Sequence, residues 1–364
     1  MKNTLGSSVA VTLFGESHGP SIGVVIDGLA PGMKVDRTFM EKMLSRRRPA
    51  GAISTGRQEQ DPFVIESGVF EGYTTGTPVC IRIPNSDIRS GDYSASRDLA
   101  RPSHADYTAN EKYHGFEDYR GGGHFSGRLT AALVAAGALV MPALADKGIR
   151  IGTHIRRCAG IADRAFSDLQ KDMDALQKMD FAVLDAAAGK KMQQAILQAK
   201  ANGDSVGGVL ETAITGLEAG LGEPWFDSVE SVLSHMLFSV PAVKGVEFGA
   251  GFAIADMTGA EANDPFCMEN GKVQTKTNHS GGINGGITNG MPVIFRCAVR
   301  PTPTISREQE TVDIRKRENT VLAAKGRHDP CIVHRARVVV DCVTALTVCD
   351  LLALRHGADW LVEK

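Results

Sequence analysis

Apolar residues recur at helical spacing in several separate parts of the chain. The clearest pattern covers residues 129–144, where leucine and valine return every three or four positions and alanine fills the gaps. This spacing predicts a helix that packs closely against its neighbours. By the same criterion, further helical segments are expected at 36–48, 163–201, 228–238 and 338–354.

Alternating apolar and polar residues, typical of half-buried strands, lie between these helical segments. Because strands and helices follow one another irregularly, without a linker or repeat, the pattern favours one mixed α and β domain over residues 1–364. It argues against a doubly wound dinucleotide-binding fold. The predicted strands span residues 9–14, 22–26, 63–70, 78–83, 206–215, 243–248, 252–257 and 292–299.

The composition narrows the class of protein. Hydrophobic residues make up 43% of the chain, enough for a large core, and a formal net charge of −2 argues against nucleic-acid binding by bulk electrostatics. The apolar segment 338–354 contains Asp341 and Asp350 and is too short for a membrane span, so we expect no membrane contact. Seven cysteines without a Cys-x-x-Cys pair fit neither a disulfide framework nor a zinc site, and no signal peptide is apparent. We therefore expect a cytoplasmic protein without a metal site.

The stretch 101–128 is dense in polar residues and glycine. Its glycine triplet, 121–123, stands just before the predicted helix at 129–144, where backbone amides and the helix N-terminus favour an anion. Arg101, Arg120 and Arg128 can bind phosphate or carboxylate through two parallel hydrogen bonds. A solvated loop is the alternative interpretation of any single glycine triplet.

Three polar turns carry histidines: 15–20 with His18, 101–106 with His104, and 326–330 with His328 and Asp329. Their spacing does not match a metal site, whereas histidine in a turn suits acid–base chemistry because it titrates near neutral pH. Each turn alone is more often structural. Together with the arginines beside two of them, the turns indicate an enzyme that acts on an anionic small molecule by proton transfer.

The same segments carry a resemblance that extends nearly end to end. The relevant stretches are FGESHGPSIGVVIDGLAPG at 14–32, RRRP at 46–49, FEGYTTGTP at 70–78, RPSHADYT at 101–108, GLGEPWFDS at 220–228, AVKGVEFGAGF at 242–252, NHSGGINGGITNG at 278–290, RPTPTI at 300–305 and KGRHDPC at 325–331. In this order they resemble the chorismate synthase family. So many ordered segments are far more specific than any single motif.

The resemblance implies an α+β fold, a β-α-β sandwich with antiparallel sheets enclosed by helices. It implies a lyase of the shikimate pathway of aromatic amino acid biosynthesis, which removes phosphate from 5-enolpyruvylshikimate 3-phosphate by 1,4-elimination and yields chorismate. Reduced FMN is required with no net redox change, and a homotetramer is expected. Whether this chain reduces its own flavin with NADPH, as some members of the family do, is left open.

The resemblance also implies roles for individual residues. His18 would act near the leaving phosphate, His104 beside the flavin ring, and Asp329 in relaying a proton from flavin N5. The implied substrate-binding residues are Arg47, Arg48, Arg57, Arg128 and Arg327. The implied flavin-binding residues are His124, Phe125, Ser126, Pro241, Ala242, Gly285, Arg300, Pro301, Thr302, Pro303, Thr304 and Arg327.

Some positions depart from the family pattern. The glycine loop reads GGGHFSGR where members usually read GGGRSSAR, Pro241 replaces an asparagine, and Arg300 replaces a lysine. A catalytically silent paralogue that binds a phosphorylated ligand is therefore the alternative to an active enzyme. The loop 50–62 has few apolar residues and is predicted to be a mobile part of the active site.

Overall fold

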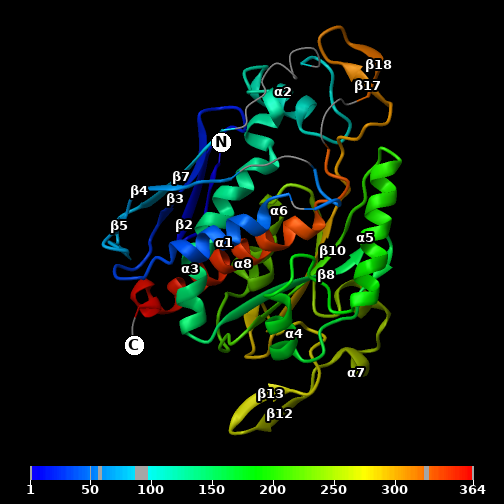
Figure 1. Ribbon diagram of the computed structural model, residues 1–364. Coiled ribbons are helices and arrows are strands. Elements are labelled where there is room, and N and C mark those ends of the chain that lie inside the picture. The colour runs from blue at the N-terminus through cyan, green and yellow to red at the C-terminus, as the bar shows by residue number, and fades with distance from the viewer. Residues whose placement is uncertain (1, 50, 56–59, 87–96, 324–327, 363–364) are drawn as a thin grey trace.

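Two five-stranded antiparallel sheets lie on either side of a layer of helices in the computed structural model (Figure 1). The structure describes residues 2–49, 51–55, 60–86, 97–323 and 328–362. Parts of the loop predicted to be mobile, residues 50 and 56–59, lie outside these ranges. The three layers share one continuous hydrophobic core.

The first sheet has the strand order β1-β2-β3-β7-β4. Strands β2 and β3 pair through the tight turn that carries His18, and β3 is buried because it lies near the centre of the sheet. The alternating pattern along 78–83 matches β7, whose valine and isoleucines face the core. The strands are Thr4–Leu5 (β1), Ala10–Gly15 (β2), Ser21–Asp27 (β3), Val64–Ser67 (β4) and Val79–Pro84 (β7).

The second sheet has the strand order β11-β16-β10-β8-β9. Its strand β8 is not among the predicted strands, because charged residues interrupt the apolar alternation of the sequence RIGTHIRRC. In the structure this strand pairs along its whole length with β10. The strands are Arg150–Cys158 (β8), Ile161–Ala162 (β9), Gly208–Thr215 (β10), Val243–Phe248 (β11) and Val293–Val299 (β16).

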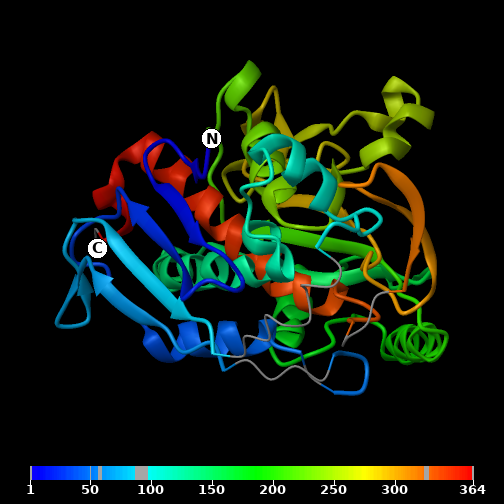
Figure 2. The ribbon, with the colours of Figure 1, turned by 90° about the horizontal axis from the view of Figure 1, so that it is seen from above.

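The helices between the sheets are α1 (Arg37–Arg47), α3 (Thr130–Asp146) and α8 (Val333–His356), as Figure 2 shows from above. The helix α3 packs on the first sheet and on α8, and α8 packs on the second sheet. The two helices approach closely at Gly137, where a Cβ atom would lie 2.3 Å from the backbone oxygen of Cys342. Residues 127–146 have the length and composition of a membrane span, but 78% of the apolar window is buried inside the protein, as in a core helix.

The remaining elements surround these layers. The predicted helical segment 163–201 contains two helices. The predicted strand 252–257 is wrong, because residues Gly251–Asp256 form an exposed 3₁₀ turn. The glycine-rich segment 278–290 contains a short hairpin. The other helices are α2 (Asp106–Tyr113), α4 (Leu169–Leu176), α5 (Ala186–Ala201), α6 (Val229–Ser239) and α7 (Gly259–Ala262). The hairpins pair β5 (Val69–Phe70) with β6 (Tyr73–Thr74), β12 (Phe266–Glu269) with β13 (Lys272–Thr275), β14 (Ile283–Asn284) with β15 (Ile287–Thr288), and β17 (Gln309–Asp313) with β18 (Glu318–Leu322).

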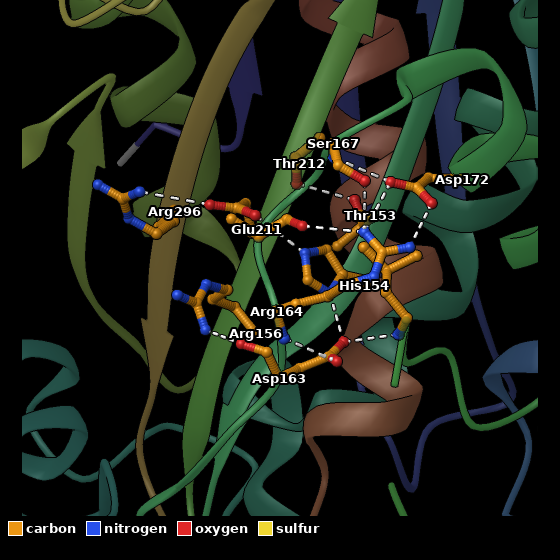
Figure 3. Close-up of polar contacts among 12 residues, drawn as sticks. Thr153, His154, Arg156, Asp163, Arg164, Ser167, Asp172, Glu211, Thr212 and Arg296 are labelled. Carbon is orange, nitrogen blue, oxygen red and sulfur yellow. Dashed lines mark hydrogen bonds and ion pairs between the residues drawn. The ribbon is translucent and has the colours of Figure 1, made fainter. Parts of the chain in front are cut away.

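A buried polar cluster crosses the second sheet (Figure 3). His154 of β8 is fully buried and lies 2.9 Å from Asp163 Oδ2 through Nδ1 and 2.9 Å from Glu211 Oε2 through Nε2. Arg296 of β16 contacts the other oxygen of Glu211 at 3.3 Å and Glu247 of β11 at 2.6 Å. An ionised carboxylate only accepts hydrogen bonds, so both ring nitrogens donate and the buried ring is an imidazolium. The cluster thus ties four strands together by charge.

Candidate active site

The glycine triplet forms a tight loop against two histidines. Gly121, Gly122 and Gly123 have φ values of 60°, 87° and 52°, in the left-handed region that favours glycine. A Cβ atom at Gly121 would lie 2.2 Å from Cε1 of His18, and one at Gly122 would lie 3.0 Å from Cε1 of His104. The triplet is therefore needed because both imidazole rings pack directly on its backbone.

His104 is held by a charged neighbour. Its Nδ1 lies 2.8 Å from Oδ1 of Asp106, and Arg101 binds both oxygens of the same carboxylate at 2.6 and 2.7 Å. Burial opposes ionisation of Asp106, but the hydrogen bonds from Arg101 and His104 outweigh it and hold the pKa of Asp106 well below its usual value. The ionised carboxylate accepts from Nδ1, so Nε2 is the nitrogen available for proton transfer.

We predict that Asp106→Asn lowers the turnover number at least about tenfold, because the amide no longer fixes the charge and orientation of the His104 ring. The measurement is the steady-state turnover rate, together with the melting temperature. Asp118→Asn is the matched control, because Asp118 pairs with Arg120 at 2.8 Å instead of with a histidine. Equal losses of rate in the two variants would contradict the role of Asp106.

A cavity of about 1200 Å³, part of it open to solvent, lies beside these residues. It lies where α1 ends and where α3 and α8 begin. Its lining contains four arginines and, among the described residues, a single carboxylate. The lining comprises Arg47, Pro49, Thr55, His104, Phe125, Ser126, Gly127, Arg128, Thr130, Val240, Pro241, Ala242, Arg300, Thr302, Pro303, Thr304, Asp329, Ile332, Arg335, Ala336 and Val339.

Asp329 is the carboxylate in this lining. Its Oδ2 lies 2.6 Å from Nη1 of Arg335, and its Oδ1 accepts a hydrogen bond from the backbone of Thr55 at 3.0 Å. Asp329 also lines a second cavity of about 610 Å³, which contains Lys200 and His328. The aspartate therefore stands between the large cavity and a polar space on its other side.

The structure brings together most of the residues that the sequence indicated. Arg57 and Arg327 lie outside the described residues. The predicted residues in the cavity lining are Arg47, His104, Phe125, Ser126, Arg128, Pro241, Ala242, Arg300, Thr302, Pro303, Thr304 and Asp329. The described residues that were predicted but do not line it are His18, Arg48, His124, Gly285 and Pro301.

Three of these residues have other neighbours, and their predicted roles stay predictions. His124 Nδ1 lies 2.8 Å from the backbone oxygen of Gly15, so this side chain links the glycine loop to the end of β2. Arg48 Nη1 contacts Gln60 Oε1 at 3.5 Å. Gly285 stands in the β14–β15 turn, which packs on the N-terminus of α6.

Other residues of the site were not predicted. Arg335 lines the cavity from the first turn of α8, and Asp61 binds two arginines of the lining. A helical pattern does not say which polar side chain faces a cavity, and a loop aspartate has no distinctive spacing. Asp106 offered a signal, because it follows His104 by two residues at the start of a short helix.

Known proteins resemble this chain in sequence along nearly its whole length. The chorismate synthase family profile matches residues 9–353. The chorismate synthase of Pyrococcus abyssi is 45% identical over 351 residues, which cover 96% of this chain and 98% of the relative. The chorismate synthase of Dehalococcoides mccartyi is 45% identical over 361 residues, which cover 98% of each chain.

The fold also matches a solved structure, described as a crystal structure of chorismate synthase. The TM-score is 0.77 at 26% sequence identity, over 98% of this chain and 94% of that chain. The predicted α+β class and the β-α-β order of layers are thereby confirmed. Sequence and fold agree along nearly the whole length, and the chain belongs to the chorismate synthase family.

Proposed function

We propose that the large cavity is the site at which this chain makes chorismate. The chain is a carbon–oxygen lyase of the shikimate pathway of aromatic amino acid biosynthesis, and its reaction is the elimination of phosphate from 5-enolpyruvylshikimate 3-phosphate. The observation that carries the assignment is the meeting of four arginines with His104 and Asp329 in the lining of one cavity. The reaction requires anion binding and proton transfer, and these residue types can provide both.

The arginines suit the substrate, which bears a phosphate and carboxylates. Arg47 and Arg128 are buried, so water screens their charge less than at the surface. The helix α8 begins at the cavity, and its N-cap Ile332 provides no side-chain hydrogen bond, which leaves the positive end of the helix available to an anion. Cationic groups fixed around a leaving phosphate stabilise the charge that grows on it in the transition state.

We further propose that reduced FMN binds in the same cavity. An apolar surface of Val240, Pro241, Ala242 and Val339 suits a flavin ring, with Phe125 as an aromatic neighbour and Arg300 within reach of a phosphate. When bound, reduced flavin supplies the electron density that assists loss of phosphate, with no net oxidation or reduction.

In this proposal the protein's own residues handle the protons. Asp329 would stand beside the bound flavin and accept a proton there, and its carboxylate also lines the second cavity. His104, with Nδ1 held by Asp106, presents Nε2 beside the flavin site. His18 serves the leaving phosphate, and Ser17 Oγ, 3.2 Å from its Nδ1, helps to orient the ring.

We also propose a homotetramer in the cytoplasm. Large apolar side chains are exposed on two 3₁₀ turns, Trp225–Asp227 and Gly251–Asp256: Trp225 is 84% exposed, Phe226 89% and Phe252 85%. Phe266 and Met268 of the projecting β12–β13 hairpin add to them (Figure 1). Apolar exposure of this extent supports contact with further copies of the chain. Light scattering coupled to size exclusion should give four times the chain mass, and a monomer at micromolar concentration would contradict this.

An anaerobic assay tests the function. Purified protein is mixed with 5-enolpyruvylshikimate 3-phosphate and chemically reduced FMN, and chorismate and inorganic phosphate are measured. We expect equal amounts of the two products, with no flavin consumed. Tight binding of the substrate without turnover, at saturating reduced FMN, would instead favour the catalytically silent paralogue.

A further inference from the structure

We propose that Asp61 is a positioning residue of the active site, which holds Arg47 and Arg128 as one preset anion-binding pair. This inference rests on the proposed function of the cavity and adds a residue that touches neither substrate nor cofactor. The side chain of Asp61 is fully buried, and each of its oxygens binds a different arginine.

The contacts form a continuous polar network. Asp61 Oδ2 lies 3.2 Å from Nη1 of Arg47, and Asp61 Oδ1 accepts from Nη1 of Arg128. Both guanidinium groups are buried almost as deeply as the carboxylate, with side chains 6% and 7% exposed. Two cations this close repel each other strongly away from water, and the shared carboxylate compensates that repulsion.

The remaining donors of the two arginines fix where each group points. Arg47 donates from Nε to Thr130 Oγ1 at 2.9 Å and from Nη2 to the backbone oxygen of Gly127 at 3.0 Å. Arg128 donates from Nε to Asn85 Oδ1 at 3.1 Å. These acceptors belong to the start of α3 and to the end of the first sheet, which are rigid parts of the fold. The pair is therefore anchored to the scaffold and joined by one carboxylate.

The location of Asp61 decides between two opposite roles. A carboxylate in front of the arginines would compete with the substrate, whereas one behind them would hold them for it. Arg47 and Arg128 both line the cavity, and Asp61 is absent from the described residues of that lining. Its side chain is also fully buried, so Asp61 does not face the cavity in front of the pair. A displacement of about 1 Å in such a binding group can cost about 100-fold in rate, so the carboxylate matters even without touching substrate.

Asp61→Asn tests the charge with little change of shape. The backbone φ of Asp61 is 48°, a conformation that asparagine adopts as readily as aspartate. We expect KM for 5-enolpyruvylshikimate 3-phosphate to rise at least about tenfold and kcat to fall as well, with FMN affinity unchanged, because substrate binding and stabilisation of the leaving phosphate both lose the preset arginines. FMN affinity is measured by quenching of flavin fluorescence, independently of turnover.

Asp172→Asn is the matched control. Asp172 is another buried aspartate paired with an arginine, Arg164, at 2.5 Å, but it lies on α4 away from the cavity. It should lower the melting temperature without raising KM. A KM that is unchanged or lower in Asp61→Asn would overturn the proposal, and a lower value would mean that the carboxylate competes with the substrate.

Asp61→Glu is measured in parallel, so that the test does not depend on the folding of one variant. Glutamate keeps the charge but moves it by one methylene, and KM should rise about threefold or more. An unchanged KM in this variant would contradict a positioning role. The wild-type assay distinguishes this outcome from failure of the proposed function. A wild-type protein that binds the substrate without turnover would contradict the proposed reaction and would not bear on the role of Asp61.

Discussion

Asp329→Asn is expected to lower the turnover number by about 100- to 10,000-fold, the usual contribution of a positioned proton-transfer group. An amide has nearly the same shape as the carboxylate but does not accept a proton. The interactions of Asp329 with Arg335 and with the backbone of Thr55 fix its orientation in the cavity wall, so the loss should appear in kcat more than in ligand binding. The measurements are kcat under anaerobic conditions and the dissociation constant of FMN.

The control is Asp204→Asn, at a position that lines the same second cavity as Asp329. Asp204 lines the second cavity and pairs with Arg307 at 3.0 Å, at a more exposed position. Its substitution should change kcat by less than about threefold, as is usual for surface positions. If Asp329→Asn keeps more than a tenth of the wild-type kcat, Asp329 does not relay the proton.

His154→Leu should lower the free energy of unfolding by about 3–5 kcal/mol, because it leaves the buried carboxylates of Asp163 and Glu211 without their shared cation. Leucine fills much of the space of the ring, so the loss reports mainly on charge. Urea unfolding followed by circular dichroism measures it. His356→Leu is the matched control: His356 binds Glu218 at a more exposed site, where such a pair contributes less than about 1 kcal/mol.

The difference in unfolding free energy between wild type and His154→Leu should depend on pH, and the direction of that dependence can be predicted. Burial alone would lower the pKa of His154, but its hydrogen bonds to Asp163 and Glu211 raise it above the ordinary value of 6.5. The stability that His154 adds is therefore complete below the unfolded-state pKa and is lost as pH rises through the folded-state pKa. For Asp163 and Glu211, burial opposes ionisation, but hydrogen bonding to His154 prevails and lowers each pKa.

The contribution of these carboxylates is thus present above their unfolded-state pKa and is lost as pH falls. The difference in unfolding free energy between wild type and His154→Leu should be largest between about pH 4.5 and 6.5, and it should shrink as the pH rises through the raised folded-state pKa of His154. A difference that grows steadily with pH would show that His154 is buried as a neutral ring.

Some of the fold could be predicted because local pattern determined it. The helix at 129–144 was recognised almost to the residue, since its apolar period persists over the whole of α3. The strand β8 was missed for the opposite reason. Its His154 and Arg156 are polar residues whose partners, including Asp163 and Glu211, come from other segments, so local alternation does not reveal the strand.

The segment 252–257 shows the converse error. Its apolar residues suggested a strand, but they are exposed on a 3₁₀ turn, where Phe252 is among the most exposed large apolar side chains of the described residues. Apolar character in a sequence predicts burial, but it does not say whether the side chains are buried within the chain or against another copy, as proposed above for this surface.

Some residues of the candidate site could likewise be predicted from the sequence, and others could not. His104, Arg128 and Asp329 were indicated by family motifs, and the structure brings them to one cavity from distant segments. Asp61 and Arg335 were not indicated, because their importance comes from what they contact in three dimensions. Neither a loop aspartate nor an arginine in the first turn of a helix has a sequence pattern that distinguishes it from a solvated residue.

A crystal structure with FMN and 5-enolpyruvylshikimate 3-phosphate bound tests the central claim most directly. We predict that the substrate phosphate lies within about 3.2 Å of a guanidinium nitrogen of Arg47 or Arg128. The flavin ring should lie against Pro241 and Ala242, with His104 and Asp329 beside the two ligands. Ligands bound elsewhere, with this cavity left to solvent, would contradict the assignment of the active site.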